Sequence, residues 1–447
     1  MRALALLAAF LALPGAAAAN PLDMYGFGAR GASLAGAVGA DVSDTSAVYY
    51  NPAGLARLRG LRIEVGYQFN APALRTDGRD NGVEAAHGIT GGVAAPGRVF
   101  GLPFALGVAF HIPDARLSQV LTPVQTQPRW ELYGVRTQRL FIGAAVAISP
   151  LRWLHLAGGI AFMASTEGGI EIAGRISATM PDTSALTHTV DADLTAVRYA
   201  HFGAQAELGR GVSLGVTYRD EFRLSLGLDA TLRGQITIGP ADNPRSFAIP
   251  GAYALRSRTL TAFQPRQVTA SAAWQINARW RLGVDLTWNQ WSRYEDPTAA
   301  LEISLDLNIP PGLGVTSPAV PAPTQRIALG FRDTLTPRFG ISYDAPLGRH
   351  SLALRAGYHW DPSPVPDPRG ITTLIDADRH VASIGAGLIL RALGAAIPGA
   401  VVLDAFASAQ ILPARVIQKD DPTDRTGDFV ADGLVWSAGL TAAVGFR

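Results

Sequence analysis

Trp280-Arg281-Leu282-Gly283-Val284-Asp285-Leu286-Thr287-Trp288-Asn289 is the stretch of sequence that decides the fold. Its large apolar side chains occupy every second position, and small or polar residues stand between them. Such alternation predicts a β-strand with one apolar and one polar face. Eight residues separate the two tryptophans, which is roughly 27 Å at about 3.3 Å per residue. In a strand tilted by about 40° this gives about 20 Å of height, close to the apolar band between the aromatic girdles of a membrane barrel.

The same alternation recurs along most of the chain. Fourteen segments carry it, and an even number is typical of single-chain bacterial barrels. The predicted strands are residues 60–70, 88–95, 103–112, 137–148, 152–164, 198–208, 211–221, 265–276, 279–290, 336–344, 350–360, 380–391, 399–410 and 433–446. Residues 168–180 and 225–236 are also strand-like and are expected to extend neighbouring strands above the membrane.

The connections between these segments are alternately short and long, without exception. The short ones lie around residues 96–102, 149–151, 209–210, 277–278, 345–349 and 392–398. The long ones lie around residues 71–87, 113–136, 165–197, 222–264, 291–335, 361–379 and 411–432. In a closed antiparallel barrel every second connection lies on the same side, and the short turns face the periplasm. We therefore predict an all-β transmembrane antiparallel β-barrel of about 14 strands with both termini in the periplasm.

The N-terminal residues have the layout of a secretory signal peptide. Arg2 is followed by an apolar run over residues 3–13, a Pro14-Gly15 break and small residues at 17–19. The apolar run is shorter than the about 20 residues that a membrane-spanning helix needs. Residues 20–59 are rich in small residues and can fold back into the lumen, which fourteen strands leave wider than side chains can fill. The predicted division is residues 1–19 signal peptide, 20–59 N-terminal plug (hatch) and 60–447 barrel.

Composition excludes several classes of protein. The chain has no cysteine, so disulfides, thiolate metal sites and a cysteine nucleophile are excluded. The net charge is +2 with both signs interspersed, which gives no basic footprint for nucleic acid. The eight histidines form no His-x-His or HExxH spacing, so no metal and no cofactor are predicted. With 48 glycines, 30 prolines and 17% charged residues, many short strands joined by turns fit better than disorder.

Several motifs resemble the FadL/TodX (OMPP1-like) outer-membrane transport family for hydrophobic compounds and long-chain fatty acids. Residues 28–37 (GARGASLAGA), 44–50 (DTSAVYY) and 51–55 (NPAGL) resemble the family's hatch. Further matches follow in order at residues 287–292 (TWNQWS), 355–358 (RAGY), 363–367 (SPVPD) and 375–379 (IDADR), the last with Ile375 where the family pattern has proline. The resemblance implies a hatch-gated, non-enzymatic channel for passive uptake of long-chain fatty acids or of aromatic or aliphatic hydrocarbons.

The resemblance also implies where gating and exit take place. The hatch residues would be Phe27, Gly28, Arg30, Asn51, Pro52 and Ala53. Asn-Pro is also an ordinary turn initiator, so a plain turn is the alternative for the last three. In the family, ligands leave laterally beside a kinked third strand, which here ends at His111-Ile112-Pro113. Proline cannot donate to a strand ladder, so a break is predicted there; the alternative is that Pro113 merely ends the strand.

Candidate ligand-binding residues lie on the lumen face and in the long loops. Arg281 and Arg355 would face the lumen, where an arginine suits a carboxylate head group. The alternative is a structural network of lumen charges together with Asp285, His201 and Glu207. The apolar loop residues Ile170, Ile172, Phe247 and Ile249 are candidates for ligand capture; alternatively they pack the loops together.

Two other functions compete with transport. An outer-membrane lipase-type enzyme needs a Ser/His/Asp or Asn constellation at one rim, and the predicted strands show no such pairing. A structural or adhesive barrel would use its loops to bind partners. For transport, the expected partners are a hydrophobic small molecule, outer-membrane lipid and lipopolysaccharide, and the barrel-assembly machinery. The chain is then expected to be a monomer in the bacterial outer membrane.

Overall fold

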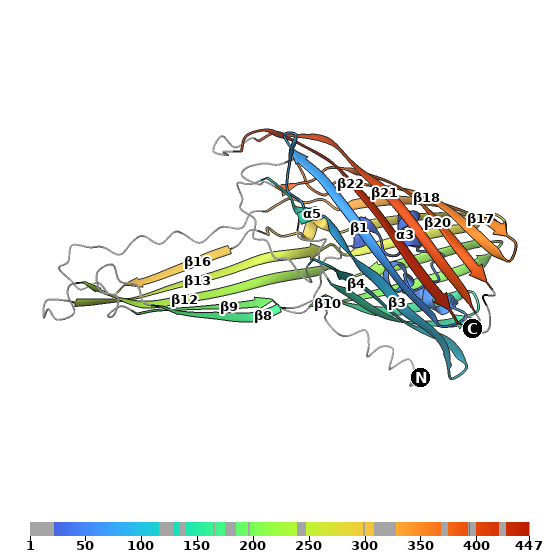
Figure 1. The fold of residues 1–447 in the computed structure, drawn as a ribbon, viewed down its shortest axis with the longest axis horizontal. Coiled ribbons are helices and arrows are strands. Elements are labelled where there is room, and N and C mark those ends of the chain that lie inside the picture. The colour runs from blue at the N-terminus through green and yellow to red at the C-terminus, as the bar shows by residue number, and fades with distance from the viewer. Residues whose placement is uncertain are drawn as a thin grey trace.

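Fourteen antiparallel strands close into one barrel (Figure 1). The computed structural model describes residues 22–115, 128–134, 140–163, 166–174, 185–194, 197–238, 247–297, 300–307, 328–367, 374–391, 393, 399–419 and 426–446. The barrel sheet contains fifteen strands, but the two-residue β2 (Arg79–Asp80) only extends β1. The fourteen are β1 (Arg62–Thr76), β3 (Ala86–Val99), β4 (Leu102–Pro113), β6 (Phe141–Leu151), β7 (Leu154–Met163), β10 (Val197–Gly209), β11 (Val212–Arg219), β14 (Gln267–Gln275), β15 (Trp280–Asn289), β17 (Thr334–Leu347), β18 (His350–Asp361), β20 (Arg379–Arg391), β21 (Ala400–Ile417) and β22 (Phe429–Gly445).

Each of these strands overlaps one of the fourteen predicted segments, so the predicted barrel is confirmed. The barrel closes because β1 pairs with β22 on one side and with β3 on the other. Short and long connections alternate as predicted. We call the end that carries the short connections the short-turn end and the opposite end the long-loop end. β1 begins and β22 ends together at the short-turn end, where Arg62 pairs with Gly445.

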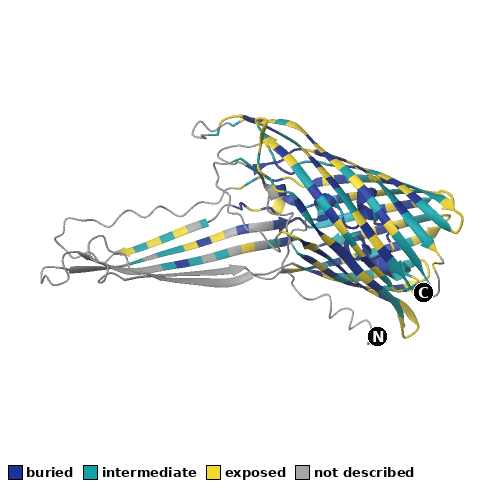
Figure 2. Cartoon of the chain, in the orientation of Figure 1, coloured by how far each residue is buried: buried dark blue, intermediate teal, exposed yellow. Residues whose placement is uncertain are grey.

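The apolar face of the strands points outward, and the polar face points into the lumen. In β15, Val284 and Leu286 are 43% and 45% exposed, whereas the alternate residues Asp285 and Thr287 are buried. Buried and exposed residues alternate in this way around the whole barrel (Figure 2). An apolar exterior around a polar interior is the arrangement of a β-barrel in lipid. No helix among the described residues is long and apolar enough to cross a membrane.

A second sheet extends away from the long-loop end of the barrel (Figure 1). Its strands pair in the order β16 (Ala300–Leu307), β13 (Phe247–Gln264), β12 (Phe222–Ile238), β9 (Ala185–Leu194) and β8 (Thr166–Gly174). β12 begins soon after β11 ends, and β13 ends just before β14 begins, so this projecting sheet continues the course of barrel strands. Of the additional strand-like segments predicted, residues 225–236 lie in β12 and 168–174 in β8; residues 175–180 lie outside the described residues.

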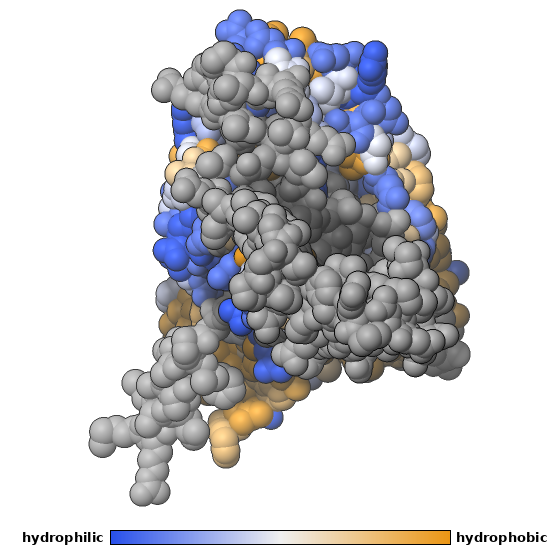
Figure 3. Space-filling model, turned by 90° about the vertical axis from the view of Figure 1, so that its left-hand side faces the viewer, coloured by the Kyte–Doolittle hydropathy of each residue, from blue (hydrophilic) through white to orange (hydrophobic). Residues whose placement is uncertain are grey.

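Short elements from the long loops cover the long-loop end of the lumen. They are β5 (Arg129–Trp130), α5 (Glu131–Gly134), η2 (Trp291–Arg293) and β19 (Leu374–Ile375). They contribute to two apolar clusters, one around Trp130, Tyr133 and Ile375 and one around Phe263, Trp291, Tyr294 and Phe331. We call these elements and clusters the aromatic lid. Seen from this end, hydrophilic residues dominate the rim and hydrophobic residues lie on the flank of the barrel behind it (Figure 3).

Candidate functional site

The lumen is occupied by the chain's own N-terminal segment, residues 22–57. This segment forms α2 (Leu22–Tyr25), α3 (Ala29–Ser33), α4 (Ala47–Tyr50) and η1 (Pro52–Arg57), and nearly all of it is buried. α3 packs against β20 and β21, and η1 packs against β6, β7 and β10. The segment runs from the long-loop end, where Asp23 meets the last residue of β11, toward the short-turn end, where Arg57 pairs with Glu207 at 2.9 Å. It therefore fills the passage through the barrel over most of its height.

Glycines in the barrel wall allow the backbone of this segment to lie directly against the strands. A Cβ atom on Gly215 would lie 2.5 Å from the carbonyl oxygen of Gly39, and one on Gly357 would lie 2.5 Å from the amide nitrogen of Ala35. A Cβ atom on Gly283 would likewise lie 2.4 Å from the carbonyl oxygen of Ala37, whereas one on Gly385 would meet the side chain of Ser33. Real Cβ atoms do not approach backbone this closely, so the wall has glycine where the segment touches it. The sequence analysis did not identify these glycines of the wall.

Asn51, predicted as a hatch residue, ties the segment both to itself and to the wall. Its Nδ2 donates to the carbonyl oxygens of Gly39, at 2.7 Å, and of Ala204 in β10, at 3.1 Å. Its Oδ1 accepts from the amide of Ala53 at 3.2 Å, which caps η1, with Pro52 in the first position of that helix. An ordinary Asn-Pro turn does not need side-chain hydrogen bonds from Asn51 to the carbonyl oxygens of Gly39 and Ala204. The contacts to Gly39 and β10 give this asparagine a docking role.

Arg30 holds a second part of the segment together. It forms ion pairs with Asp44 at 3.2 Å and with Asp41 at 3.4 Å, and Asp41 also pairs with Arg281 of β15 at 3.1 Å. Burial acts to raise the pKa of Asp44, but Arg30, Arg62 and hydrogen bonds from Ser46 hold this pKa below its ordinary value of 3.8. Asp44 is therefore a charged anchor at neutral pH. The predicted hatch residue Phe27 is buried beside Tyr49 and Phe141, and Gly28 has a φ of 68° that favours glycine.

Asp23 of α2 receives hydrogen bonds from four side chains. Arg219 Nη1 donates to Oδ1 at 2.7 Å, and the Tyr49 hydroxyl donates to the same oxygen. The amides of Gln264 and Gln267 donate to Oδ2 at 2.8 and 3.1 Å. We call Arg219, Tyr49, Gln264 and Gln267 the carboxylate receptor. The sequence analysis assigned no role to Arg219 or to Asp23.

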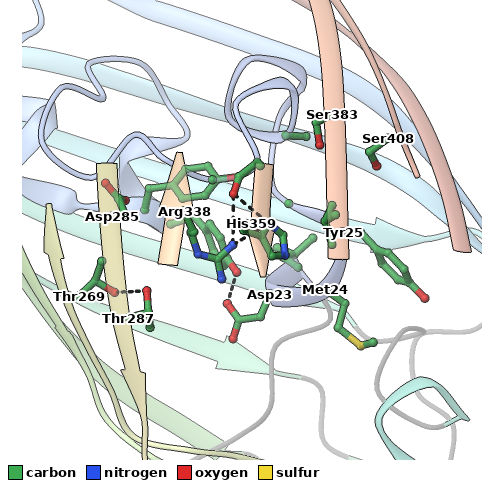
Figure 4. Close-up of a pocket in the computed structure, with 18 of the residues that line it drawn as sticks. Asp23, Met24, Tyr25, Thr269, Asp285, Thr287, Arg338, His359, Ser383 and Ser408 are labelled. Atoms are coloured by element: carbon green, nitrogen blue, oxygen red, sulfur yellow. Dashed lines mark hydrogen bonds between the residues drawn. The ribbon is translucent and has the colours of Figure 1, made fainter. Parts of the chain in front are cut away.

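A cavity of about 70 Å³ lies between the N-terminal segment and the wall (Figure 4). Thr269 and Thr287 join across β14 and β15 at 3.0 Å on its wall. Arg338 and His359 both approach the carbonyl oxygen of Ala35, each at 3.2 Å. Pockets for drug-sized ligands measure about 300–1,000 Å³. This cavity is too small for such a ligand.

A larger cavity, of about 430 Å³, opens at the short-turn end. Its walls carry five charged side chains, which are Asp41, Arg57, Arg152, Glu207 and Arg281. We call these five side chains the charged collar. A hydrophobic solute that passed the collar would displace water from its charges, which is unfavourable.

The two arginines predicted to bind a head group are engaged with acids of the protein. Arg355 is buried and pairs with Asp404 of β21 at 2.6 Å. Arg281 pairs with Asp41 and donates to Gln275 at 2.6 Å. This geometry favours the alternative of a structural lumen network, and their role in ligand binding stays a prediction.

The other predicted site residues lie apart from the receptor. Ile170 is in β8, and Phe247 and Ile249 are in β13, so these three and Ile172 belong to the projecting sheet. His111, Ile112 and Pro113 end β4 at the long-loop end. The β3–β4 ladder reaches Pro113, paired with Gly88, whereas the β4–β6 ladder stops at His111, paired with Phe141. Neither the β3–β4 ladder nor the described part of the β4–β6 ladder contains a register shift. No group of metal-ligating residues occurs among the described residues.

Together, an outward apolar face, a polar lumen and a lumen-filling N-terminal segment define a plugged outer-membrane β-barrel. The family model described as outer membrane protein transport protein (OMPP1/FadL/TodX) matches residues 137–414, and the chain belongs to this family. It is therefore a bacterial outer-membrane transport protein and not an enzyme, as the sequence motifs predicted.

Solved structures share the fold over nearly their whole length. A FadL homologue from Pseudomonas aeruginosa superposes with a TM-score of 0.62 at 16% identity, covering 94% of this chain and 98% of that one. The toluene transporter TodX of P. putida gives 0.53 at 15% identity, with 95% and 99% covered. CymD, a monoaromatic hydrocarbon channel, gives 0.53 at 15% identity, with 94% and 98% covered. At these identities the likeness concerns the fold. No curated protein sequence matches the chain.

Proposed function

We propose that this barrel takes up hydrophobic small molecules by passive diffusion and that residues 20–59 are its hatch. The observation that carries the proposal is the N-terminal segment, which fills the lumen and, apart from its continuation into β1, meets the wall only through non-covalent contacts. It is held by hydrogen bonds and ion pairs such as those of Asn51, Arg30 and Asp23. Such contacts can be exchanged one by one, because each contributes only about 0.5–3 kcal/mol. Phe27, Gly28, Arg30, Asn51, Pro52 and Ala53 are then its gating residues.

The long-loop end suits the capture of a hydrophobic molecule from outside. Buried aromatic side chains gather in the aromatic lid, for example Phe263 against Tyr294 with ring centroids 5.2 Å apart. The similar solved channels are named for toluene and monoaromatic hydrocarbons, and one is a FadL homologue. Ile170, Ile172, Phe247 and Ile249 of the projecting sheet would serve as a first contact. The short turns and the C-terminus would then face the periplasm; the predicted signal peptide lies outside the described residues.

Exit through the barrel wall near Pro113 fits the charge distribution better than exit along the axis. The axial route passes the charged collar of the 430 Å³ cavity, which includes Arg57, Glu207 and Arg281. By contrast, Ile112 and Pro113 extend β4 past the end of the β4–β6 ladder, and Ile112 is 40% exposed on the outer face. Separating β4 from β6 at this end breaks fewer ladder hydrogen bonds than separating them farther along the two strands. We propose this edge as the lateral opening.

A disulfide between β4 and β6 should close the lateral route. Phe110 and Ile142 are register partners, and the chain has no other cysteine. The double variant Phe110→Cys/Ile142→Cys should lose most toluene uptake when oxidised and regain it on reduction. The control pair Ala270→Cys/Leu286→Cys joins β14 to β15 at an equivalent outer-face position and should transport normally in both states. Uptake that survives oxidation of the first pair would rule out this exit.

The transport function itself is tested with the purified barrel in liposomes. Toluene and dodecanoic acid should enter faster than into empty liposomes, whereas glucose should not. Vesicles that pass neither hydrophobic compound would refute the proposed function. Monomeric state, lipopolysaccharide contact and recognition by the assembly machinery remain predictions.

A further inference from the structure

The structure assigns a carboxylate-binding site to Arg219, Tyr49, Gln264 and Gln267, and we infer that Asp23 occupies it as a tethered substitute for the carboxylate of an incoming amphiphile. The inference rests on the proposed transport function and names a ligand class for it: molecules with one carboxylate and an apolar body. Binding of such a ligand and docking of α2 would then be mutually exclusive.

The receptor has the donor set that a carboxylate needs. Four donors from three separate parts of the chain converge on the two oxygens of Asp23. One donor is a guanidinium, and hydrogen bonds that involve charged partners are the stronger kind. Gln264 and Arg219 are buried, so the site is largely screened from bulk water. Burial of an unpaired carboxylate in such surroundings would cost free energy, and so would burial of the Arg219 guanidinium without an anionic partner.

Arg219 and Gln267 of the receptor are also held by contacts that do not involve Asp23. Arg219 Nη2 donates to the carbonyl oxygen of Tyr49 at 2.8 Å, and Nη1 also donates to Gln267 Oε1 at 2.8 Å. The guanidinium lies over the Tyr49 ring, 4.6 Å from its centroid. Gln267 is further bonded to Asn289 at 3.0 Å. Since these contacts do not involve α2, Arg219 and Gln267 stay oriented when α2 leaves.

α2 has the chemistry of an amphiphile. Asp23 stands between Leu22 and Met24, and both apolar side chains are buried in hydrophobic clusters of the lumen. Leu22 shares its cluster with Phe222 and Tyr199, and Met24 shares the other with Trp130 of the aromatic lid. Release of Leu22–Tyr25 would therefore expose apolar surface next to a carboxylate receptor. That combination fits an alkyl or aryl carboxylate and gives no advantage to a plain hydrocarbon.

The receptor also lies where captured ligands would arrive. Arg219 is the last residue of β11, Gln264 the last of β13 and Gln267 the first of β14. These residues bracket the junction of the barrel with the projecting sheet (Figure 1). A carboxylate that replaces Asp23 at this junction would release the first helix of the N-terminal segment. Ligand binding and the first step of unplugging would thus be one event.

The test compares an acid with the alcohol of the same chain length on the full barrel in non-ionic detergent. Dissociation constants for dodecanoic acid and dodecanol are measured by calorimetry, with folding checked by the heat-dependent mobility shift of barrels. Asp23→Asn removes the tethered carboxylate and should tighten dodecanoate binding by about tenfold, with dodecanol unchanged. Arg219→Gln and Gln267→Ala should weaken dodecanoate only. Asp432→Asn removes a half-buried carboxylate that pairs with Arg75 away from the receptor, and this variant should bind dodecanoate as the wild type does.

The outcomes separate this inference from the proposed function. If Asp23→Asn leaves the preference for acid over alcohol unchanged while the wild type still transports toluene, the inference fails and the transport function stands. Weaker binding of both acid and alcohol by Gln267→Ala would likewise show a purely structural role. Asp23→Glu retains the negative charge, so its affinity for dodecanoate should stay close to that of the wild type. If Asp23→Glu binds dodecanoate as tightly as Asp23→Asn does, the carboxylate of residue 23 does not compete with the ligand and the inference is overturned.

Discussion

Deletion of residues 22–57, with Pro21 joined to Leu58, is expected to turn the barrel into an open, water-filled pore. The wall that the segment covers is polar, with buried Asp285, Arg355 and Gln410 facing inward. Once the segment is gone, these groups can be hydrated at no cost, so water and ions fill the lumen. Barrels with a few more strands are open aqueous channels. Conductance across a planar bilayer should rise roughly tenfold or more over the wild type.

Closure of the barrel does not depend on the deleted residues. β1 begins at Arg62 and pairs with β22 and β3 through its own backbone. The variant should therefore still show the heat-dependent mobility shift of a folded barrel. A folded deletion variant with the low conductance of the wild type would mean that the long loops, and not residues 22–57, close the pore.

Gly357→Val should displace the N-terminal segment by steric overlap alone. A Cβ at this position would lie 2.5 Å from the Ala35 amide nitrogen and would overlap the backbone of Leu34. Backbone cannot rotate away as a flexible side chain can, and overpacking of this kind costs about 1–3 kcal/mol. The population of the undocked segment should rise between about 5- and 150-fold. Amide hydrogen exchange of residues 33–40 and sensitivity of cells to vancomycin should both increase.

Gly445→Val provides the matched control for this substitution. It makes the same change in a barrel strand, but the added Cβ would meet only the carbonyl oxygen of Ala400, at an ordinary 3.8 Å. Exchange in the N-terminal segment should stay at the wild-type rate. Equal acceleration in both variants would point to a general loss of barrel stability and would contradict a specific clash with the segment.

Most of the barrel can be predicted from local sequence because its physics is local. The alternation in residues 280–289 and its repeats assigns each residue to the lipid or lumen face, since side chains of a strand alternate with a period of two. In a bilayer every backbone group must be paired, so strands of this kind must close into a barrel. The alternating loop lengths then indicate an even number of strands, with both termini at the same end of the barrel. Even the C-terminal strand, residues 433–446, was predicted within a few residues of β22.

The candidate site was harder to predict, and the reason is geometric. Asn51 was found through its motif, but its partners Gly39 and Ala204 are set by how the segment is docked. Arg355 looked like a free lumen cation, yet Asp404, two strands away along the wall, pairs with it. Face alternation says that a side chain points inward; it does not say at what height or toward which neighbour.

The sequence by itself determined that this protein is exported, that fourteen strands cross the membrane and that an N-terminal arm is available to fill the lumen. The periodicity of the side chains, the loop lengths and the motifs are properties of short stretches of sequence, so they can be recognised without knowledge of the fold. Only the tertiary structure decided what the arm touches. Asp23 meets Arg219, Gln264 and Gln267 from positions about 200 to 240 residues apart in the chain, because barrel closure and the path of the arm bring them to one point. That convergence turns one aspartate of a four-residue helix into the occupant of a carboxylate site.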